Sequence, residues 1–291
     1  MQPLEGVTVA DLTLYLPGSF ATRELQRLGA RVVKIEPPAG DPLAATAPAW
    51  YGALNGGKEI LSWDARSEPP PAALTEADVV LEGFRPGVWE RLGVQLADST
   101  ILCSITGFGA NGPLAGRAGH DLNYLGYAGA LADTAPEIPP VQIADLAAGA
   151  QGAAIEVLAA LLERQRTGRG ARIVVSMTHG TYRLIAHRLG GDPVPRLLTG
   201  GAACYRIYET ADARYLTVAA LEPRFWQRLC ELIGMPELAD RAFEPELPEL
   251  AGLFRTRPLA DWLALLEHED TCVGPVLSLE EAARELSAPT D

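Results

Sequence analysis

The sequence predicts an α/β fold, an open parallel sheet with helices on both faces, followed by a smaller α+β domain. Short β-branched runs alternate with segments of helical spacing through the first part of the chain. Tight Gly and Pro joints separate these segments, as parallel crossover connections require. The pattern changes at Gly191–Pro195, which has the composition of a linker. We therefore expect a large domain over residues 1–190 and a small domain over residues 191–291.

The first elements form a strand–helix–strand unit. Val7–Leu12 is an apolar strand, Ala21–Leu28 has helical spacing, and Arg31–Ile35 is a second strand. Gly29 stands where a helix commonly ends. The unit predicts a Rossmann-like sheet, but its first loop lacks the GxGxxG signature, so a dinucleotide site is not indicated.

Further elements continue this alternation and then depart from it. Punctuating Gly, Pro and Asp residues bound each expected strand, and a long Ala/Leu-rich helix precedes the last strand of the sheet. The second domain begins with two alternating segments around a short turn, which predicts a β-hairpin followed by amphipathic helices. The expected segments are the strands Glu59–Trp63, Asp78–Leu81, Ile101–Ile105 and Arg172–Met177, the helix Leu146–Arg166, the hairpin strands Tyr205–Tyr208 and Tyr215–Ala219, and the helices Glu222–Ile233 and Leu259–Leu266.

Composition excludes several classes of function. The 291 residues carry a net charge of −13 without a Lys/Arg-rich run, so nucleic acid and anionic membrane surfaces are not expected partners. Four widely spaced cysteines lack CxxC or zinc spacing and indicate free thiols in a reducing compartment. The start of the chain has no signal-peptide pattern, and no apolar segment is expected to approach the ~20 residues that span a bilayer. A cytoplasmic location is predicted.

An imidazole and a carboxylate lie in Gly/Ala-rich segments that a substrate can approach closely. His120 stands in Gly119–Tyr124, and Asp145 follows in Gln142–Leu146. Histidine titrates closest to neutral pH, and burial raises a carboxyl pKa toward the same range. Placed on opposite sides of one carbon, the two groups would exchange protons with both of its faces. The alternative is a structural histidine beside a helix-capping aspartate.

Three cations stand at the ends of successive expected strands. Lys34 ends the second strand, Lys58 precedes the third, and Arg85 follows the fourth. Open α/β sheets bind ligands at the carboxyl ends of their strands, so cations there indicate a phosphate-bearing ligand. The alternative for each of them is a solvated surface charge.

Several motifs resemble those of known enzymes along nearly the whole chain. ADVVLEGFRPG at Ala77–Gly87, SITGFGANGP at Ser104–Pro113 and TCVGPV at Thr271–Val276 resemble family III CoA-transferases of the CaiB/BaiF type. GRAGHD at Gly116–Asp121 and ALEPRF at Ala220–Phe225 are similar to the α-methylacyl-CoA racemase branch of that family. The chain is identified as a member of this superfamily on these motifs.

The resemblance implies a reaction and its residues. His120 and Asp145 would be the acid/base pair, and Glu222 a supporting carboxylate beside the histidine. They would invert the α-carbon of 2-methyl-branched acyl-CoA thioesters by proton transfer through an enolate, with CoA carried by the substrate and no metal or other cofactor. The residues that the resemblance assigns to CoA are Lys34, Asn55, Lys58, Arg85, Gly119, Asp121, Asn123 and Tyr124.

Two other functions stay open at this point. In the family's transferases the aspartate equivalent to Asp145 is a nucleophile, and an aromatic residue usually occupies the place of His120. A non-catalytic CoA-binding or structural protein is the other alternative. The resemblance also implies an interlocked homodimer, in which the site is built between the large domain of one subunit and the small domain of the other. The chain ends at Asp291, so we expect the family's C-terminal return segment to be shortened.

Overall fold

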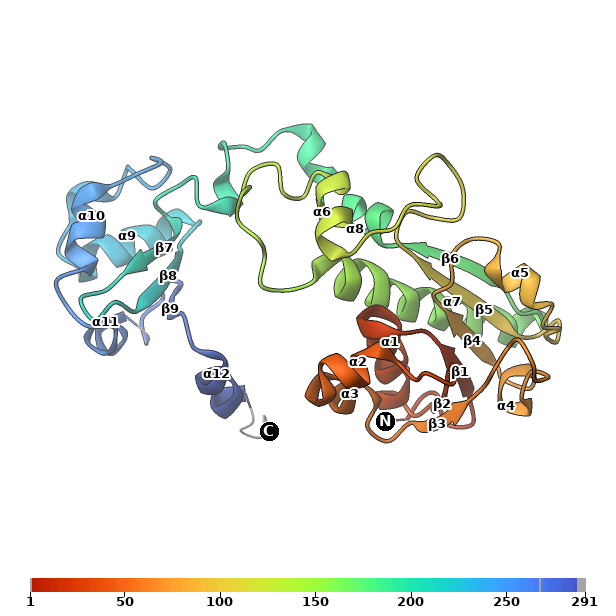
Figure 1. Ribbon diagram of the computed structural model, residues 1–291. Helices are drawn as coiled ribbons and strands as arrows, with labels where there is room; N and C mark the ends of the chain where they lie inside the picture. Colours follow the sequence, from red (N-terminus) through yellow and green to blue (C-terminus); the bar gives the residue numbers. More distant parts are fainter. Residues whose placement is uncertain (1, 267, 287–291) are drawn as a thin grey trace. The chain divides into compact units, whose positions relative to one another are not determined.

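The computed structural model describes residues 2–266 and 268–286, and its contacts divide the chain into two compact units. The first unit ends at Leu189 and the second begins at Gly190 (Figure 1). Each unit has its own hydrophobic core, and each is described by itself below.

The first unit contains a six-stranded parallel sheet in the order β3-β2-β1-β4-β5-β6. This confirms the predicted open parallel sheet. The strand order reverses between β1 and β4, and such a reversal opens a crevice at the carboxyl ends of the two strands. The strands are β1 (Thr8–Leu12), β2 (Arg31–Glu36), β3 (Glu59–Ser62), β4 (Val79–Glu82), β5 (Ile101–Thr106) and β6 (Arg172–Ser176).

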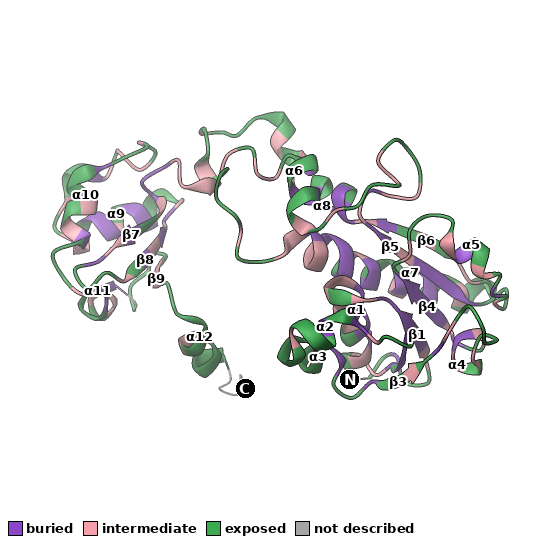
Figure 2. Cartoon of the chain, viewed as in Figure 1, coloured by how far each residue is buried: buried purple, intermediate pink, exposed green. Residues whose placement is uncertain are grey.

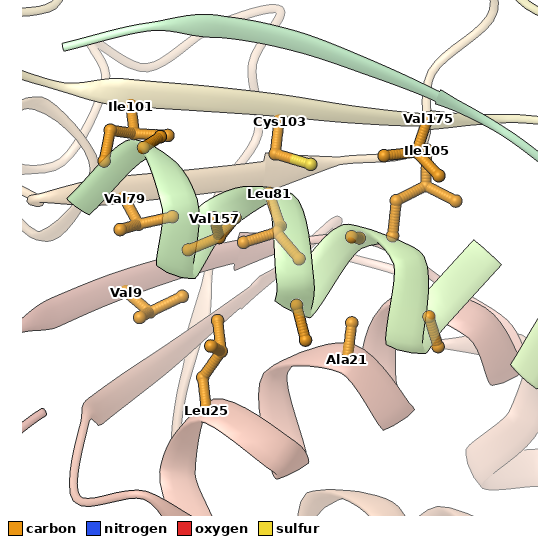
Figure 3. Close-up of a cluster of buried hydrophobic side chains, with 14 of the residues drawn as sticks. Val9, Ala21, Leu25, Val79, Leu81, Ile101, Cys103, Ile105, Val157 and Val175 are labelled. Carbon is orange, nitrogen blue, oxygen red and sulfur yellow. The ribbon is translucent and has the colours of Figure 1, made fainter. Parts of the chain in front are cut away.

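Alternating side chains of the strands pack against helices on the two faces of the sheet. Val79 and Leu81 of β4 face α1 (Tyr15–Arg27) and α7 (Gly152–Thr167), as Figure 3 shows. Val80 belongs to a separate core on the other face, with side chains of α4 (Ala72–Thr75) and α5 (Val88–Leu92). All of β4 is buried (Figure 2), which is why its sequence is apolar up to its last residue.

Helix α1 begins at Tyr15, well before the predicted start at Ala21. The sequence around Pro17 and Gly18 indicates a break, but both residues lie in the first turn of the helix. Proline is tolerated there because the N–H groups of a first turn have no acceptor within the helix. The helices that the sequence did not predict in this unit are α4, α5, α2 (Pro42–Thr46), α3 (Pro48–Asn55), α6 (Asp121–Ala128), α8 (Met177–Ile185) and the 3-10 turn η2 (Ala186–Gly190).

The long predicted helix is composed of a π-helical segment, η1 (Ala144–Gln151), that continues into α7. Together they span 24 residues and are long and apolar enough to cross a membrane by length and composition. The expectation that no such segment exists is therefore wrong. Its buried side chains, among them Ala153 and Val157, pack in the core of the first unit, so the apolar character has an internal cause.

The second unit pairs three antiparallel strands, β7 (Tyr205–Glu209), β8 (Tyr215–Ala219) and β9 (Val273–Pro275), with helices. The predicted hairpin is present. Strand β9 was not predicted because Gly274 and Pro275 disfavour a strand. The helical segments are η3 (Leu197–Thr199), α9 (Pro223–Leu232), η4 (Pro236–Leu238), α10 (Pro248–Phe254), α11 (Leu259–Leu266) and α12 (Leu279–Leu286). The expectation about the C-terminal end falls on residues 287–291, which lie outside the described ranges.

Candidate active site

A cavity of about 760 Å³ opens at the carboxyl ends of β1, β4 and β5, where the strand order reverses. Its volume falls in the usual range of roughly 300–1,000 Å³ for small-molecule sites. The segment Thr13–Gly18, the loop Gly83–Pro86 and the loop Ala118–His120 form much of its wall. Of the residues that the sequence singled out, the cavity is lined by Arg85, Gly119, His120, Asn123, Tyr124 and Asp145.

His120 occupies the N-cap position of α6, so its side chain stands at the rim of a helix N-terminus. Its backbone is extended, and its N–H donates to the Asn123 Oδ1 at 3.1 Å. This contact fixes the direction in which the chain enters the helix. The imidazole is thereby carried on an exposed residue that lines the cavity.

Tyr124 anchors the loop before His120. Its hydroxyl donates to the Gly119 carbonyl oxygen, and its ring packs edge-on against Phe108 with the ring centroids 5.1 Å apart. A Cβ atom placed on Gly107 would lie 2.5 Å from the Tyr124 Cε1, and one on Gly119 would lie 2.8 Å from it. Only glycine fits at these two positions, and the Gly-rich motifs are explained by this close approach.

Asp145 lies in the first turn of η1, and its carboxyl group is partly buried in the cavity wall. Burial raises the pKa of Asp145 to about 7, and the negative charge of Asp121 adds to this increase. Asp121 also accepts a hydrogen bond from the Asp145 N–H at 2.9 Å. Asp121 is thus a neighbour of the acid/base group and is not itself part of the cavity wall.

Two arginines give the cavity its positive charge. Arg85 is exposed, and within residues 2–266 and 268–286 its guanidinium has no hydrogen-bond or ion-pair partner. Arg117 donates to the Tyr127 hydroxyl and lies over the same ring at 5.7 Å from its centroid. The sequence interpretation missed Arg117 as a binding residue, although the GRAGHD motif contains it.

Lys34, which the resemblance assigns to CoA, does not line the cavity, and that assignment stays a prediction. Its side chain has no exposed surface and pairs with Asp41, with the Nζ and Oδ2 atoms 3.2 Å apart. The same Nζ donates to the Thr13 carbonyl oxygen at 2.8 Å and the Ser19 Oγ at 3.2 Å. These acceptors occupy the three donors of the ammonium group, so a phosphate contact requires rearrangement.

Lys58 and Asn55 form a second buried group. The Lys58 Nζ contacts the Asp11 Oδ2 at 3.4 Å and donates to the Asn55 Oδ1 at 2.8 Å. Burial lowers the pKa of Lys58 to about 8, against the opposing effect of Asp11. Both residues are internal partners in this structure and lie outside the cavity wall, and their assignment to CoA stays a prediction.

Glu222 belongs to the second unit, where it occupies the N-cap position of α9. Its backbone carbonyl accepts the N–H groups of Phe225 and Trp226 at 3.0 and 3.2 Å. Its predicted support of His120 stays a prediction. Over the described ranges, His, Cys, Asp and Glu side chains form no group of three that could hold a metal ion.

Comparison with known proteins agrees with this architecture. The model of CoA-transferase family III matches residues 4–288. The chain belongs to this family. It is 33% identical to the human alpha-methylacyl-CoA racemase over 96% of this chain and 78% of the relative. It is 32% identical to an acetyl-CoA:oxalate CoA-transferase of Acetobacter aceti, over 97% and 82%.

A solved structure extends the likeness to the backbone. The crystal structure of Rv3272 from Mycobacterium tuberculosis, a probable fatty acyl-CoA transferase, superposes with a TM-score of 0.81 at 30% identity. The match covers 97% of this chain and 85% of that chain. Racemases and transferases therefore both occur among the relatives, and the chemistry must be argued from the site.

Proposed function

We propose that the protein is a racemase or epimerase that inverts the α-carbon of 2-methyl-branched acyl-CoA thioesters. One observation carries the proposal: His120 and Asp145 line the same cavity, and burial with Asp121 raises the Asp145 pKa to about 7. A carboxyl group in that range both accepts and donates a proton at neutral pH. Histidines titrate in the same range as a class. The cavity thus holds two side chains suited to proton transfer.

In the proposed reaction one group removes the α-proton and the other returns a proton to the opposite face. The intermediate is an enolate, whose oxygen carries the negative charge and needs hydrogen-bond donors. Helix α6 begins at Asp121, directly after the cavity-lining His120, so the N-terminus of the helix stands next to the imidazole. The N-terminus of a helix also favours negative charge through its dipole.

The raised pKa favours proton transfer over nucleophilic attack. A carboxylate nucleophile needs only the ionised form, whereas a group that both accepts and donates a proton needs both forms, and a pKa of about 7 makes both accessible near neutral pH. The similarity to the Acetobacter aceti transferase supports the second candidate, a CoA-transferase with Asp145 as nucleophile. His120, in the place where the resemblance puts an aromatic residue in transferases, supports the racemase.

The rest of the proposal concerns the substrate and the assembly. Arg85 and Arg117 are the cavity cations suited to the phosphates of CoA, and the rest of the cavity is available to the pantetheine chain. CoA is then part of the substrate and no resident cofactor takes part. A homodimer, a cytoplasmic location and the absence of nucleic-acid or membrane partners are parts of the same proposal.

The proposed chemistry is tested by α-proton exchange. The protein is incubated in D₂O with (2R)- or (2S)-2-methylbutanoyl-CoA, and deuterium at C2 and optical purity are followed together. We expect deuterium incorporation with loss of optical purity when no free acid is present. Absence of exchange, with CoA transfer to an added carboxylic acid, would establish the transferase instead. Thioester binding without either reaction would establish a non-catalytic protein.

Replacement of Arg85 by alanine should weaken substrate binding. Loss of a charge-assisted phosphate contact costs about 1.5–3 kcal/mol, so we expect KM for the thioester to rise by about tenfold or more with little change in kcat. Arg169→Ala is the matched control, because Arg169 is also exposed but lies outside the cavity wall. An unchanged KM in Arg85→Ala would remove this residue from the CoA site.

A further inference from the structure

The cavity wall includes a short segment whose backbone is held in an unfavourable conformation. Tyr15, the first residue of α1, has a φ of +63°, a region that bulky L-residues rarely occupy. Such a conformation costs about 1–3 kcal/mol and persists only where neighbouring groups fix it. The side chain is also half exposed and lines the cavity. The strain therefore lies at the proposed site.

The buried Lys34–Asp41 pair fixes the chain on both sides of this strain. The Lys34 Nζ holds the Thr13 carbonyl oxygen at 2.8 Å, just before the strained turn. Asp41 accepts the Tyr15 N–H with both carboxylate oxygens, at 3.1 and 3.3 Å. The pair itself is closed at 3.2 Å and has no exposed side-chain surface. One ion pair thus bridges the residues that flank Leu14.

Further hydrogen bonds and packing contacts hold the backbone before and after Tyr15. Asp11 accepts the Thr13 N–H at 3.0 Å, and Thr13 in turn fills the space that a Cβ atom on Gly18 would need. Asp41 caps α2 by accepting the Leu43 N–H at 2.9 Å. The turn is consequently tied to β1, β2 and α2 at once. Among the described residues, its next N–H, that of Leu16, has no acceptor, and Leu16 lines the cavity.

Net stabilisation is a poor explanation for such a pair. Removing two charges from water offsets most of their mutual attraction, and apolar residues of similar volume are often as stabilising. A buried pair does, however, select one geometry, because each charge must keep its partner. The geometry selected here is that of the cavity wall.

We propose that Lys34 and Asp41 are positioning residues, which hold the Thr13–Leu16 turn in the conformation that receives the acyl-CoA substrate. This inference rests on the proposed function for the identity of the substrate. It gives Lys34 an indirect part in binding: the ammonium group shapes the wall and does not touch the phosphates. Without the pair, Tyr15 relaxes toward negative φ and the wall beside the substrate moves. A displacement of about 1 Å near reacting groups is enough to cost up to about 100-fold in rate.

The test replaces the pair by apolar residues and measures binding apart from turnover. In the full chain, Lys34→Met combined with Asp41→Leu removes both charges and leaves neither unpaired. We expect a lower melting temperature, because the Tyr15 and Leu43 N–H groups and the Thr13 carbonyl oxygen lose their side-chain partners. Kd for 2-methylbutanoyl-CoA by calorimetry and KM should both rise about tenfold, and kcat should fall by a similar factor. Unchanged Kd, KM and kcat in the folded double variant would overturn the proposal.

A second variant and a matched control keep the result decisive. Asp41→Asn preserves an acceptor for the Tyr15 N–H but removes the charge that Lys34 faces, so we expect a smaller rise in Kd, about threefold. If the double variant does not fold, an unchanged Kd in Asp41→Asn overturns the proposal. Arg164→Met is the control. Arg164 forms a partly buried ion pair with Asp78 at the amino ends of the strands, with the Nη2 and Oδ1 atoms 3.0 Å apart. Its replacement should lower the stability of the fold without changing Kd.

The two proposals fail in different ways. If the parent protein binds the thioester but neither exchanges the α-proton nor transfers CoA, the proposed function is wrong. The positioning role is then judged on Kd alone, and a rise in the double variant still supports it. If the parent does not bind the thioester, both proposals are wrong.

Discussion

Replacement of His120 by alanine should abolish α-proton exchange from one enantiomer of a 2-methylacyl-CoA and largely spare exchange from the other. In the proposed two-base reaction, each enantiomer presents its proton to only one of the two groups that line the cavity. With the imidazole absent, Asp145 still deprotonates the enantiomer on its own side. We expect a loss of about 1,000-fold for the other one, within the range of general acid–base catalysis. Asp145→Ala should show the opposite preference.

Racemisation behaves differently from exchange in these variants. Inversion needs both groups in one catalytic cycle, so optical purity should persist in His120→Ala and in Asp145→Ala alike. His179→Ala is the matched control, since His179 is hydrogen-bonded to Ser176 at 2.8 Å and lines another cavity. Deuterium incorporation, measured separately for each enantiomer, tests the assignment of His120 and Asp145 as the two acid/base groups. Equal losses for both enantiomers in both variants would contradict the two-base assignment.

The fold was largely predictable because its strands are short, apolar and bounded by Gly, Pro or Asp. Strand β4 illustrates this: every one of its residues is buried, so local sequence and tertiary environment agree. Helix α1 illustrates the limit. A Pro-Gly pair is an ordinary break signal, and the helix contains it because the Tyr15 N–H is held by Asp41, which is distant in sequence.

The sequence predicted the cavity residues that belong to recognisable motifs. It did not predict the lysines whose place depends on acidic side chains from other parts of the chain. His120, Asp145 and Arg85 line the cavity because they follow strands or begin helices at one edge of the sheet. Lys34 lies in β2 and Lys58 directly precedes β3, and both lysines are buried. Their acidic partners come from other elements, and a single sequence does not reveal which acid each lysine meets. A signal was present in Asp11, since a carboxylate in an apolar strand needs a buried counter-charge.

Replacement of Asp145 by asparagine should stabilise the protein at pH 8 while abolishing racemisation. The Asp145 pKa is higher in the folded protein, about 7, than the ordinary aspartate value of 3.8, so folding favours the protonated form. The resulting destabilisation is absent below the ordinary value, grows as pH rises toward 7, and is complete above it. A shift of about three pKa units corresponds to about 4 kcal/mol, and we halve this to about 2 kcal/mol because the carboxyl group is only partly buried.

Urea unfolding at pH 5 and pH 8 measures this effect, with a larger gain from Asp145→Asn expected at pH 8. Burial is the main cause of the raised pKa and the charge of Asp121 is the second, so Asp121→Asn should lower the Asp145 pKa. The amide side chain introduced by Asp121→Asn keeps an acceptor for the Asp145 N–H, and the geometry of the η1 start is retained. In the Asp121→Asn background the gain from Asp145→Asn at pH 8 should therefore shrink, and the two substitutions should be non-additive. A gain from Asp145→Asn that is the same at both pH values would show that Asp145 is not held near neutrality, and would remove the main support for proton transfer over nucleophilic attack.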